Sequence, residues 1–300
     1  MNKRFVLAMV IALFTLSSAV FASNRKAGHV ILIGLDGWGS YSVEKADMPH
    51  VKKLMQEGAY TLKKRSVLPS SSAVNWASMF MGAGPELHGY TDWGSKTPEL
   101  PSRVVTENNI FPTIFGLLRK ADPKAEIGCL YEWDGIKYLV DTLSLNYYEQ
   151  SPDYTKNPTA LCDMACRYIK DKKPVLAAVC FDNPDHVGHQ DGHNTEAYYA
   201  KLNELDAYIG KIIAAMKDAG IYDDSVIIVT SDHGGIDKGH GGKSMMEMET
   251  PFIIAGKNIR KSGLFEESMM QFDCASTIAA LFGLQQPQVW IGRPMSQVFR

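Results

Sequence analysis

The chain has 300 residues, 45% of them hydrophobic, and its 31 basic and 33 acidic residues give a net charge of −2. This length and composition suffice to bury a large core, which excludes a mainly disordered protein. The near-neutral charge offers no basic field for nucleic acid, so we predict no nucleic-acid docking surface. Because the five cysteines are an odd number, at least one is unpaired or bonded to another chain. We interpret them mainly as buried apolar side chains.

The amino terminus has the pattern of a secretory signal peptide. The basic pair Lys3-Arg4 precedes an apolar run over residues 5–16, and small residues then lead to Ala22. The run is short and is followed by hydroxyl residues, which disfavours a membrane span. We therefore predict a signal peptide over residues 1–22 and one domain over residues 23–300. The mature protein is expected to be exported, periplasmic or secreted, without a stable membrane anchor; an uncleaved anchor is the alternative.

Apolar, β-branched segments predict buried strands, and amphipathic or capped segments predict helices between them. The strands are expected at residues 29–35, 126–131, 174–181, 225–230 and 251–254. The helices are expected at residues 47–58, 76–81, 111–120, 159–170, 194–217 and 273–282. This alternation predicts an α/β fold: a single-domain, doubly wound, mostly parallel sheet with helices on both faces. Residues 89–109 and 143–157 are expected to form loops, the first near the mouth of a site.

Carboxylates and imidazoles follow three of the predicted strands. In open α/β sheets, sites collect at the carboxyl ends of strands, so we expect these side chains to converge. They are Asp36, Asp185, His189, Asp232, His233 and His240. Asp185 and His189 lie four residues apart in a predicted loop, and His240 follows His233 in a glycine-rich stretch. Mixed oxygen and nitrogen donors of this kind suit a metal site.

Three consecutive serines, Ser70, Ser71 and Ser72, precede the predicted helix over residues 76–81. A hydroxyl at a helix amino terminus is commonly a cap, but it can also be a nucleophile placed where the helix dipole favours anions. Three carboxylates, three imidazoles and a hydroxyl suffice for two divalent cations that share one nucleophile. Such a pair of cations supports in-line displacement at phosphorus.

These motifs and their order resemble the alkaline phosphatase superfamily and, within it, the type I phosphodiesterase/nucleotide pyrophosphatase family. The resemblance extends from Val30 to about Pro294 and rests on five short motifs in the family's order. It implies an alkaline phosphatase-like catalytic domain. The implied activity is hydrolysis of phosphodiester or phosphoanhydride bonds in a small-molecule phosphate ester, with two divalent metal ions, most simply zinc, and a covalent phosphoserine intermediate.

The resemblance also implies a role for each site residue. The family nucleophile lies three residues before an asparagine, which selects Ser72 before Asn75. Asn75 is then expected to bind a non-bridging phosphate oxygen together with the Ser72 backbone amide. The implied ligands of one zinc are Asp185, His189 and His240. Those of the other are Asp36, Ser72, Asp232 and His233.

Departures from the family pattern leave the substrate open. Ser72 replaces the usual threonine, and Ala73 and Val74 replace an aromatic residue and a proline, of which the aromatic helps to stack a nucleobase. The Cys-x-Pro-x-Arg motif of sulfatases is absent, which disfavours sulfatase chemistry. A phosphomonoesterase is the first alternative, with Arg103, Lys137 and Lys243 as possible cationic partners of terminal phosphate oxygens. A phosphonate hydrolase and a degenerate, metal-binding envelope protein are further alternatives.

The remaining histidines are expected to pack, cap or support the ligands rather than to bind metal. They are His29, His50, His88, His186 and His193. His186 is the nearest rival ligand because it lies three residues from His189. The sequence leaves the oligomeric state open, and the ligand types also permit manganese or iron.

Overall fold

The computed structural model describes residues 25–300, so the predicted signal peptide over residues 1–22 lies outside the described residues. The strands are β1 (His29–Leu35), β2 (Ala59–Arg65), β3 (Ile127–Tyr131), β4 (Tyr147–Gln150), β5 (Leu176–Phe181), β6 (Ser225–Thr230), β7 (Glu249–Gly256) and β8 (Gly263–Leu264). They form an eight-stranded sheet in the order β4-β3-β5-β1-β6-β7-β2-β8. All neighbours pair in parallel except those of β7, so the predicted mostly parallel sheet is confirmed.

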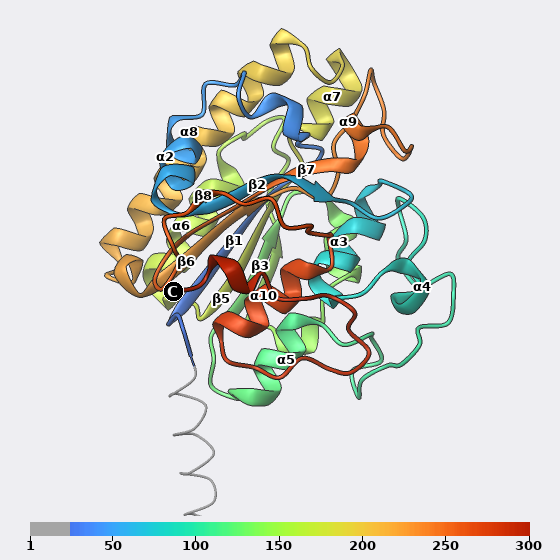
Figure 1. Ribbon diagram of the computed structural model, residues 1–300, viewed down its shortest axis with the longest axis vertical. Coiled ribbons are helices and arrows are strands. Elements are labelled where there is room, and N and C mark those ends of the chain that lie inside the picture. Colours follow the sequence, from blue (N-terminus) through green and yellow to red (C-terminus); the bar gives the residue numbers. More distant parts are fainter. Residues whose placement is uncertain (1–24) are drawn as a thin grey trace, which may run out of the picture.

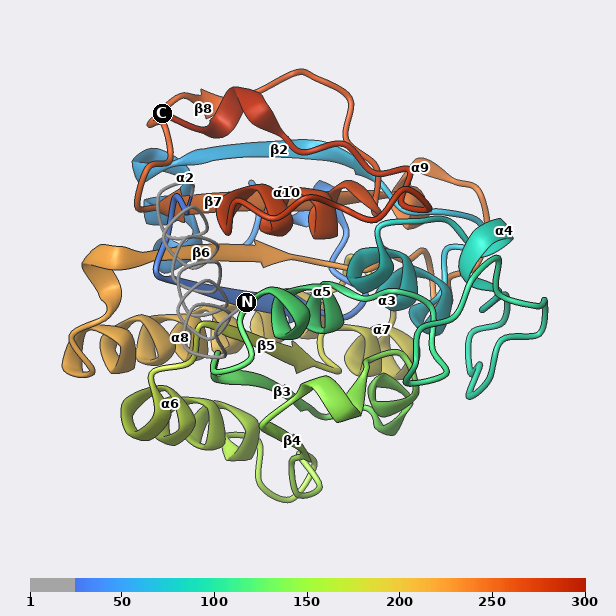
Figure 2. The ribbon, with the colours of Figure 1, turned by 90° about the horizontal axis from the view of Figure 1, so that it is seen from below.

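Helices cover both faces of this sheet (Figures 1 and 2). They are α2 (Pro49–Glu57), α3 (Ser72–Met81), α4 (Pro85–His88), α5 (Ile114–Ala121), α6 (Ala160–Lys172), α7 (Asp185–Asp191), α8 (Glu196–Asp218), α9 (Met245–Met248) and α10 (Asp273–Leu281). Alternate side chains of a strand point to opposite faces. In β1, Val30 and Leu32 accordingly pack with α3, α5 and α10, whereas Ile31 and Ile33 pack with α2, α6 and α8. The doubly wound architecture predicted from the sequence is confirmed.

The five predicted strands are present, and three further strands are not predicted. β2 ends in Lys63-Lys64-Arg65, a charged segment that lacks the apolar pattern of a buried strand. β4 lies at one edge of the sheet, within residues 143–157, where the sequence predicts a loop, and its last three residues are exposed. β8 has only two residues. Short or polar edge strands carry little sequence signal because tertiary pairing, more than composition, decides them.

Two helices differ from the prediction in ways that affect the site. Residues 185–191, expected as a loop, form α7, which begins after Pro184 and ends at Gly192. Asp185 and His189 therefore lie one helical turn apart on one face. α3 begins at Ser72, four residues before the predicted start, so this serine lies in the first turn of the helix.

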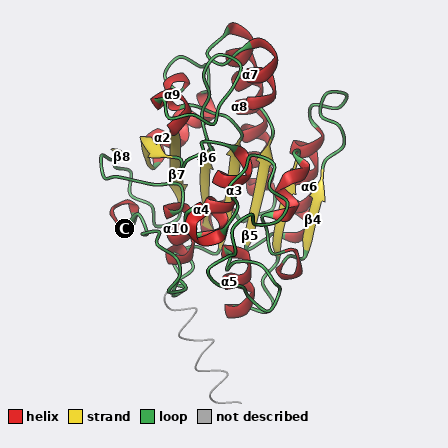
Figure 3. Ribbon diagram, turned by 90° about the vertical axis from the view of Figure 1, so that its right-hand side faces the viewer, coloured by secondary structure: helices red, strands yellow, loops and turns green. Residues whose placement is uncertain are grey.

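The carboxyl ends of β1, β5 and β6 meet at one end of the sheet, where α7 and α9 lie (Figure 3). All five cysteines are free and four of them are buried, in line with their interpretation as apolar side chains. Within residues 25–300, no helix combines the length and the apolar content needed to cross a bilayer.

Candidate metal centre

The neighbouring strands β1 and β6 deliver three of the predicted ligands. Asp36 follows β1, and Asp232 and His233 follow β6, and the pairing of Gly34 with Thr230 holds the two strand ends side by side. His233 Nε2 lies 3.3 Å from Asp36 Oδ1 and 3.3 Å from Asp232 Oδ2. We call Asp36, Asp232 and His233 the inner group, because their side chains are at most 3% exposed.

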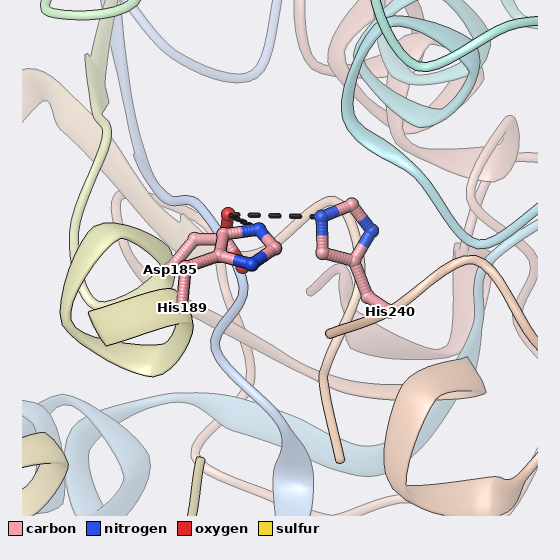
Figure 4. A group of neighbouring side chains, drawn as sticks. All are labelled: Asp185, His189 and His240. Atoms are coloured by element: carbon pink, nitrogen blue, oxygen red, sulfur yellow. Dashed lines mark ion pairs between the residues drawn. The ribbon is translucent and has the colours of Figure 1, made fainter. Parts of the chain in front are cut away.

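The other three predicted ligands form an outer group: Asp185, His189 and His240. Asp185 and His189 come from α7, and His240 comes from the loop after β6 (Figure 4). His189 Nε2 lies 3.1 Å and His240 Nε2 lies 3.7 Å from Asp185 Oδ2. The side chain of His189 is 47% exposed, so this group opens to solvent.

Asp185 also joins the two groups. Ligand atoms of Asp36, Asp185 and His233 lie within 4.8 Å of one another, as do those of Asp185, His189 and His240. This close approach depends on Gly37, which has φ of +70° and where a Cβ would lie 2.6 Å from the Asp185 Cβ. The structure therefore brings all six predicted carboxylate and imidazole ligands to one place. The division of these ligands between two metal ions stays a prediction, because the inner cluster of ligand atoms contains Asp185 with Asp36 and His233.

In all three predicted imidazole ligands, the ring nitrogen Nε2 faces the inner and outer groups. Nδ1 of each ring lies close to a backbone carbonyl oxygen, which can only accept a hydrogen bond. The rings are His189, His233 and His240, and the acceptors are the carbonyl oxygens of Lys238, Gly234 and Ser70, at 2.8, 2.8 and 3.1 Å. Nδ1 therefore carries a proton in each ring, and Nε2 is the nitrogen that faces the site, the usual arrangement of a metal-ligating histidine. In His233 and His240 this Nε2 is free to bind a metal ion, whereas in His189 it bonds Asp185 Oδ2 at 3.1 Å.

Two buried carboxylate oxygens in the inner group, Asp36 Oδ1 and Asp232 Oδ2, have no hydrogen-bond partner among the described residues. The second oxygen of each carboxylate is satisfied: Asp36 Oδ2 accepts from Trp76 Nε1 at 3.0 Å, and Asp232 Oδ1 accepts from the Gly37 N–H at 3.2 Å. An unpaired buried carboxylate oxygen is costly unless a cation neutralises it. The donor set and these unpaired oxygens fit divalent metal ions.

The pKa shifts of the site residues also fit the binding of divalent metal ions. Burial, together with repulsion from Asp185, raises the pKa of Asp232 to about 7, and burial with the neighbouring carboxylates raises the pKa of Asp36 well above its usual range. Burial lowers the pKa of His233, and it lowers the pKa of His240 to about 4. Neutral imidazoles facing mutually repelling carboxylates are the state that a bound cation stabilises.

Asp185 behaves differently from the other two carboxylates. Burial alone would raise the pKa of Asp185, but hydrogen bonds from His189 and His193 outweigh burial and lower it. The same bond to Asp185 raises the pKa of His189 to about 9.

The structure distinguishes among the three candidate serines. Ser72 Oγ lies 3.1 Å from His233 Nε2, and the Ser72 N–H has no acceptor among residues 25–300. Ser70 Oγ instead donates to the Gly242 carbonyl at 2.6 Å. Ser71 Oγ is buried without a partner among residues 25–300, and Ser71 belongs to the wall of the pocket described below. Ser72 is thus the hydroxyl that contacts the inner group, at the positive end of α3.

Asn75 lies one turn into α3 and is fully buried. Its side-chain NH₂ group contacts three carbonyl oxygens, and its Oδ1 accepts from the Val67 N–H at 2.7 Å. The three carbonyls belong to Val67, Pro69 and Ser71. The amide therefore fixes the segment that delivers Ser72, and it would have to leave these partners to contact phosphate. The predicted phosphate contact of Asn75 stays a prediction.

Two residues support the ligands: His193, which the sequence predicts to pack, cap or support them, and Lys64, which it does not assign. The His193 side chain is fully buried, with Nε2 3.3 Å from Asp185 Oδ1 and Nδ1 3.2 Å from the Asp237 carbonyl. Lys64, on the unpredicted strand β2, is also fully buried, and its Nζ donates to the Ser231 carbonyl at 2.6 Å. Burial lowers the pKa of Lys64 to about 8, while Asp232 is among the nearby groups that oppose the shift. No local pattern marks Lys64, because its contact with Ser231 is made across the fold.

His186, the rival ligand considered from the sequence, is not part of either group. Its Nδ1 lies 3.0 Å from the Tyr154 hydroxyl, and its Nε2 lies 2.8 Å from Gln190 Nε2. The Tyr154 hydroxyl also donates to Asp182. These contacts form a polar cluster that supports the loop beside the site.

A pocket of about 560 Å³ opens next to the outer group. Its wall consists of Pro69, Ser71, Thr91, Asp92, Trp93, His189, Gly239, His240 and Gly241. The segment 91–93 belongs to the loop expected near the mouth of the site, and that position is confirmed. None of Arg103, Lys137 and Lys243 lies on this wall. A larger hollow of about 740 Å³, beside β4 and α6, contains none of the predicted ligands.

Comparison with known proteins identifies the family. Residues 30–276 match the type I phosphodiesterase / nucleotide pyrophosphatase family. The chain belongs to this family. The family and superfamily predicted from the sequence are thereby confirmed.

Individual relatives are distant. A mouse bis(5′-adenosyl)-triphosphatase is 24% identical over 223 residues, covering 71% of this chain and 48% of the relative. Venom phosphodiesterase 2 of Crotalus adamanteus is 23% identical and covers 68% of this chain and 26% of its own length. The chain thus spans about half the length, or less, of these curated relatives.

Solved structures with the same fold include both phosphoesterases and sulfatases. Murine ectonucleotide pyrophosphatase / phosphodiesterase 5 superposes with a TM-score of 0.73 at 15% identity, over 91% of this chain and all of that one. A 2-O GAG sulfatase superposes with a TM-score of 0.72 at 13% identity, over 90% of this chain and 73% of that one. At these identities the likeness establishes the fold alone.

Proposed function

We propose that the chain is an exported, two-metal hydrolase that cleaves phosphodiester or phosphoanhydride bonds through a covalent phospho-Ser72 intermediate. The observation that carries the proposal is the position of Ser72 Oγ, 3.1 Å from His233 Nε2 at the start of α3. No other described serine combines a place at a helix amino terminus with contact to a predicted metal ligand. Membership of the phosphodiesterase family supports the reaction class.

In the proposed reaction, the Ser72 hydroxyl gives its proton to water and Oγ forms a bond to phosphorus, while the bond from phosphorus to the leaving oxygen breaks and that oxygen takes a proton from water. Water then cleaves the phosphoserine and regenerates the hydroxyl. The unpaired Ser72 N–H is placed to donate to a non-bridging oxygen, and Asn75 holds the segment that positions both groups. When bound, two divalent cations, which we expect to be zinc, would lower the pKa of a hydroxyl and offset phosphate charge.

The pocket favours a diester over a monoester. A monoester dianion calls for cationic side chains around its terminal oxygens. The described pocket wall carries no lysine or arginine, and Lys137 is instead paired with Asp134 at 2.6 Å. The wall does offer space for a second substituent. The names of the triphosphatase and the venom phosphodiesterase agree with substrates that have groups on both sides of phosphorus.

The test compares substrates and serine variants on purified protein whose metal content has been measured. The substrates are bis-p-nitrophenyl phosphate, p-nitrophenyl thymidine monophosphate and p-nitrophenyl phosphate. We expect the diesters to be preferred and chelator to abolish turnover. Ser72→Ala is expected to lower kcat by about a thousandfold or more with metal content retained, whereas Ser71→Ala serves as the matched control.

Each other outcome has a definite meaning. Preference for the monoester would make the protein a phosphomonoesterase with the same site. Full activity of Ser72→Ala would disprove the nucleophile. Two bound metals without turnover of any substrate would favour a degenerate binding protein.

A further inference from the structure

A fully buried lysine lies next to the inner group and takes no part in the proposed reaction. Lys64 is 0% exposed, and its Nζ donates to the Ser231 carbonyl at 2.6 Å and to Gln271 Oε1. Both acceptors are neutral, and the ion pairs of residues 25–300 do not include Lys64. A buried ammonium group without a carboxylate partner is costly. An apolar side chain of similar volume would satisfy packing at a lower cost, so packing alone does not account for Lys64.

The Lys64 side chain crosses one strand of the sheet to make this contact. β7 lies between β2 and β6, and Lys64 pairs with Thr250 of β7 (Figure 2). Because neighbouring strands lie about 4.8 Å apart, only a long side chain on β2 reaches the end of β6. The carbonyl that it contacts belongs to the peptide bond between Ser231 and Asp232. Lys64 therefore fixes the peptide that leads into the inner group.

Gln271 extends this contact to α3, the helix that carries the proposed nucleophile. Its side chain is fully buried, and its Nε2 lies 3.3 Å from the Ser231 carbonyl and 3.3 Å from the Asn75 carbonyl. Its backbone N–H donates to the Arg65 carbonyl at 2.8 Å, which holds Gln271 beside Lys64. Gln271 thus connects β2, the end of β6 and α3 through hydrogen bonds.

Few other hydrogen bonds hold α3 against the end of β6. Within residues 25–300, α3 is bonded to the segment directly after β6 by the contact of Ser72 with His233 and by this link through Gln271. Trp76 instead connects α3 with the end of β1, through Asp36 Oδ2 at 3.0 Å. Without Gln271, the serine–imidazole contact alone would set the spacing. A misplacement of about 1 Å at a reacting group can lower a rate by about a hundredfold.

We propose that Lys64 and Gln271 are positioning residues that act as one unit and set the spacing between Ser72 Oγ and the inner group. The inference rests on the proposed function and assigns two further residues to it. Neither side chain touches the substrate, because both act through the backbone carbonyls of Ser231 and Asn75. The positive charge of Lys64 strengthens its hydrogen bond to the carbonyl, and a neutral side chain loses that bond.

The experiment uses the metal-loaded, full-length mature enzyme with bis-p-nitrophenyl phosphate. Lys64→Met and Gln271→Met nearly keep the side-chain volume and remove the polar contacts. In each variant we expect kcat to fall by about 10–100-fold, with KM within about twofold of wild type and metal content unchanged. Release of p-nitrophenolate in a single turnover should slow by the same factor, because the affected step is the attack by Ser72. The double variant should lose no more than the weaker single variant, since residues that act as a unit are not additive.

Asp206→Asn is the matched control for a merely structural role. Asp206 is 1% exposed and joins α8 to α2, because its carboxylate accepts from the N–H groups of His50 and Val51 at 3.0 and 2.8 Å. These helices cover the face of the sheet opposite to α3 and α10. The variant should unfold at a lower denaturant concentration while its kcat stays at the wild-type value. If Lys64 and Gln271 only supported the fold, their variants would show this same profile.

Three results would overturn the proposal. They are a kcat near the wild-type value in both methionine variants, the loss of a metal ion from either variant, and multiplied losses in the double variant. If Lys64→Met failed to fold, the kcat and metal content of Gln271→Met would decide. In all these cases wild type still hydrolyses the diester and the proposed function stands. Failure of that function is distinct, because wild type would not turn over the diester or turnover would survive Ser72→Ala.

Discussion

Buried histidines occur in two regions of the molecule, and their hydrogen bonds differ in one respect. At the carboxyl edge of the sheet, His233 and His240 bond a backbone carbonyl through Nδ1 and face carboxylates with Nε2. At the corner between α3 and α4, both nitrogens of His88 are taken: Nε2 by the Ser78 hydroxyl at 3.0 Å and Nδ1 by the Tyr90 N–H at 3.1 Å. A free, inward-facing nitrogen separates a candidate ligand from a packed histidine.

His193 lies between these two types. Both of its nitrogens are engaged, as in His88, but one of its partners is the carboxylate of Asp185, a predicted ligand. The comparison therefore assigns three roles: binding metal, orienting a ligand, and holding two elements together. Each role has its own measurable consequence.

The largest effect is expected from His233→Ala. The variant removes the only imidazole of the inner group, so we expect one bound metal ion per chain instead of two. The rate kcat/KM should fall by about a thousandfold or more, because one cation no longer offsets phosphate charge. Metal analysis after gel filtration, alongside kinetics, checks both. Two retained ions would place the inner site elsewhere.

His88→Ala should have the opposite profile. Loss of the ring leaves the Tyr90 N–H unpaired, removes a partner of Ser78 Oγ, which keeps its bond to the Val74 carbonyl at 2.8 Å, and opens a cavity. The free energy of unfolding should therefore fall by about 2–4 kcal/mol. Both metal ions should remain, since His88 contacts no predicted ligand. Denaturant unfolding in chelator and metal analysis in its absence make the measurement. Loss of a metal ion in His88→Ala would show that His88 is not merely a packed histidine, and the distinction from the metal-facing histidines would fail.

Much of the fold and of the candidate site was predictable from the sequence, because the signals were local. β1 and β6 are continuous apolar strands that stop directly before Asp36 and shortly before Asp232-His233, so their position at the sheet edge followed from topology. The helix over Asp185 and His189 was missed. The segment is only seven residues long and lacks an apolar face. The four-residue spacing of Asp185 and His189 nevertheless places them together, because one helical turn also brings residues four apart onto the same face.

The remainder depends on contacts between distant segments. Lys64 lies on β2, whose charged residues do not give the apolar pattern of a buried strand. Its hydrogen bond to the Ser231 carbonyl forms only when β2 packs into the sheet. His193 fits because Gly188 and Gly235 flank its ring, where a Cβ would lie 2.4 and 2.2 Å away. Trp93 lies on the pocket wall, and its carbonyl accepts a hydrogen bond from the Ala73 N–H of α3. A short stretch of sequence does not reveal these contacts between distant segments.

His193→Gln tests whether His193 orients the predicted metal ligand Asp185. Glutamine can still donate to Asp185 but cannot hold the Asp237 carbonyl at the same time, so Asp185 should lose its orientation. We expect metal affinity to fall by about 10–100-fold, as for other residues that orient ligands. Competition with a chelator reads out affinity directly, and activity should return at high metal concentration. His193→Phe, which removes both bonds but keeps the volume, should be worse.

The smallest effect is the pH dependence that His88 imposes on stability. Burial lowers the pKa of His88 to about 3, although Glu99 opposes the shift, whereas in the unfolded chain the pKa is near the ordinary value of 6.5. Between these values the unfolded state binds the extra proton, so the stability present above pH 6.5 is lost as the pH falls toward 3. At pH 5 the loss is about 2 kcal/mol.

The measurement compares wild type with His88→Gln in chelator, because metal release would otherwise dominate in acid. The other titrating groups are common to both proteins, so the difference between their free energies of unfolding isolates His88. That difference should change by about 2 kcal/mol from pH 7 to pH 5, with wild type losing more. A constant difference would mean that His88 is charged in the folded state. The Tyr90 N–H could then not donate to its Nδ1, and His88 would no longer be the packed counterpart of the metal-facing histidines.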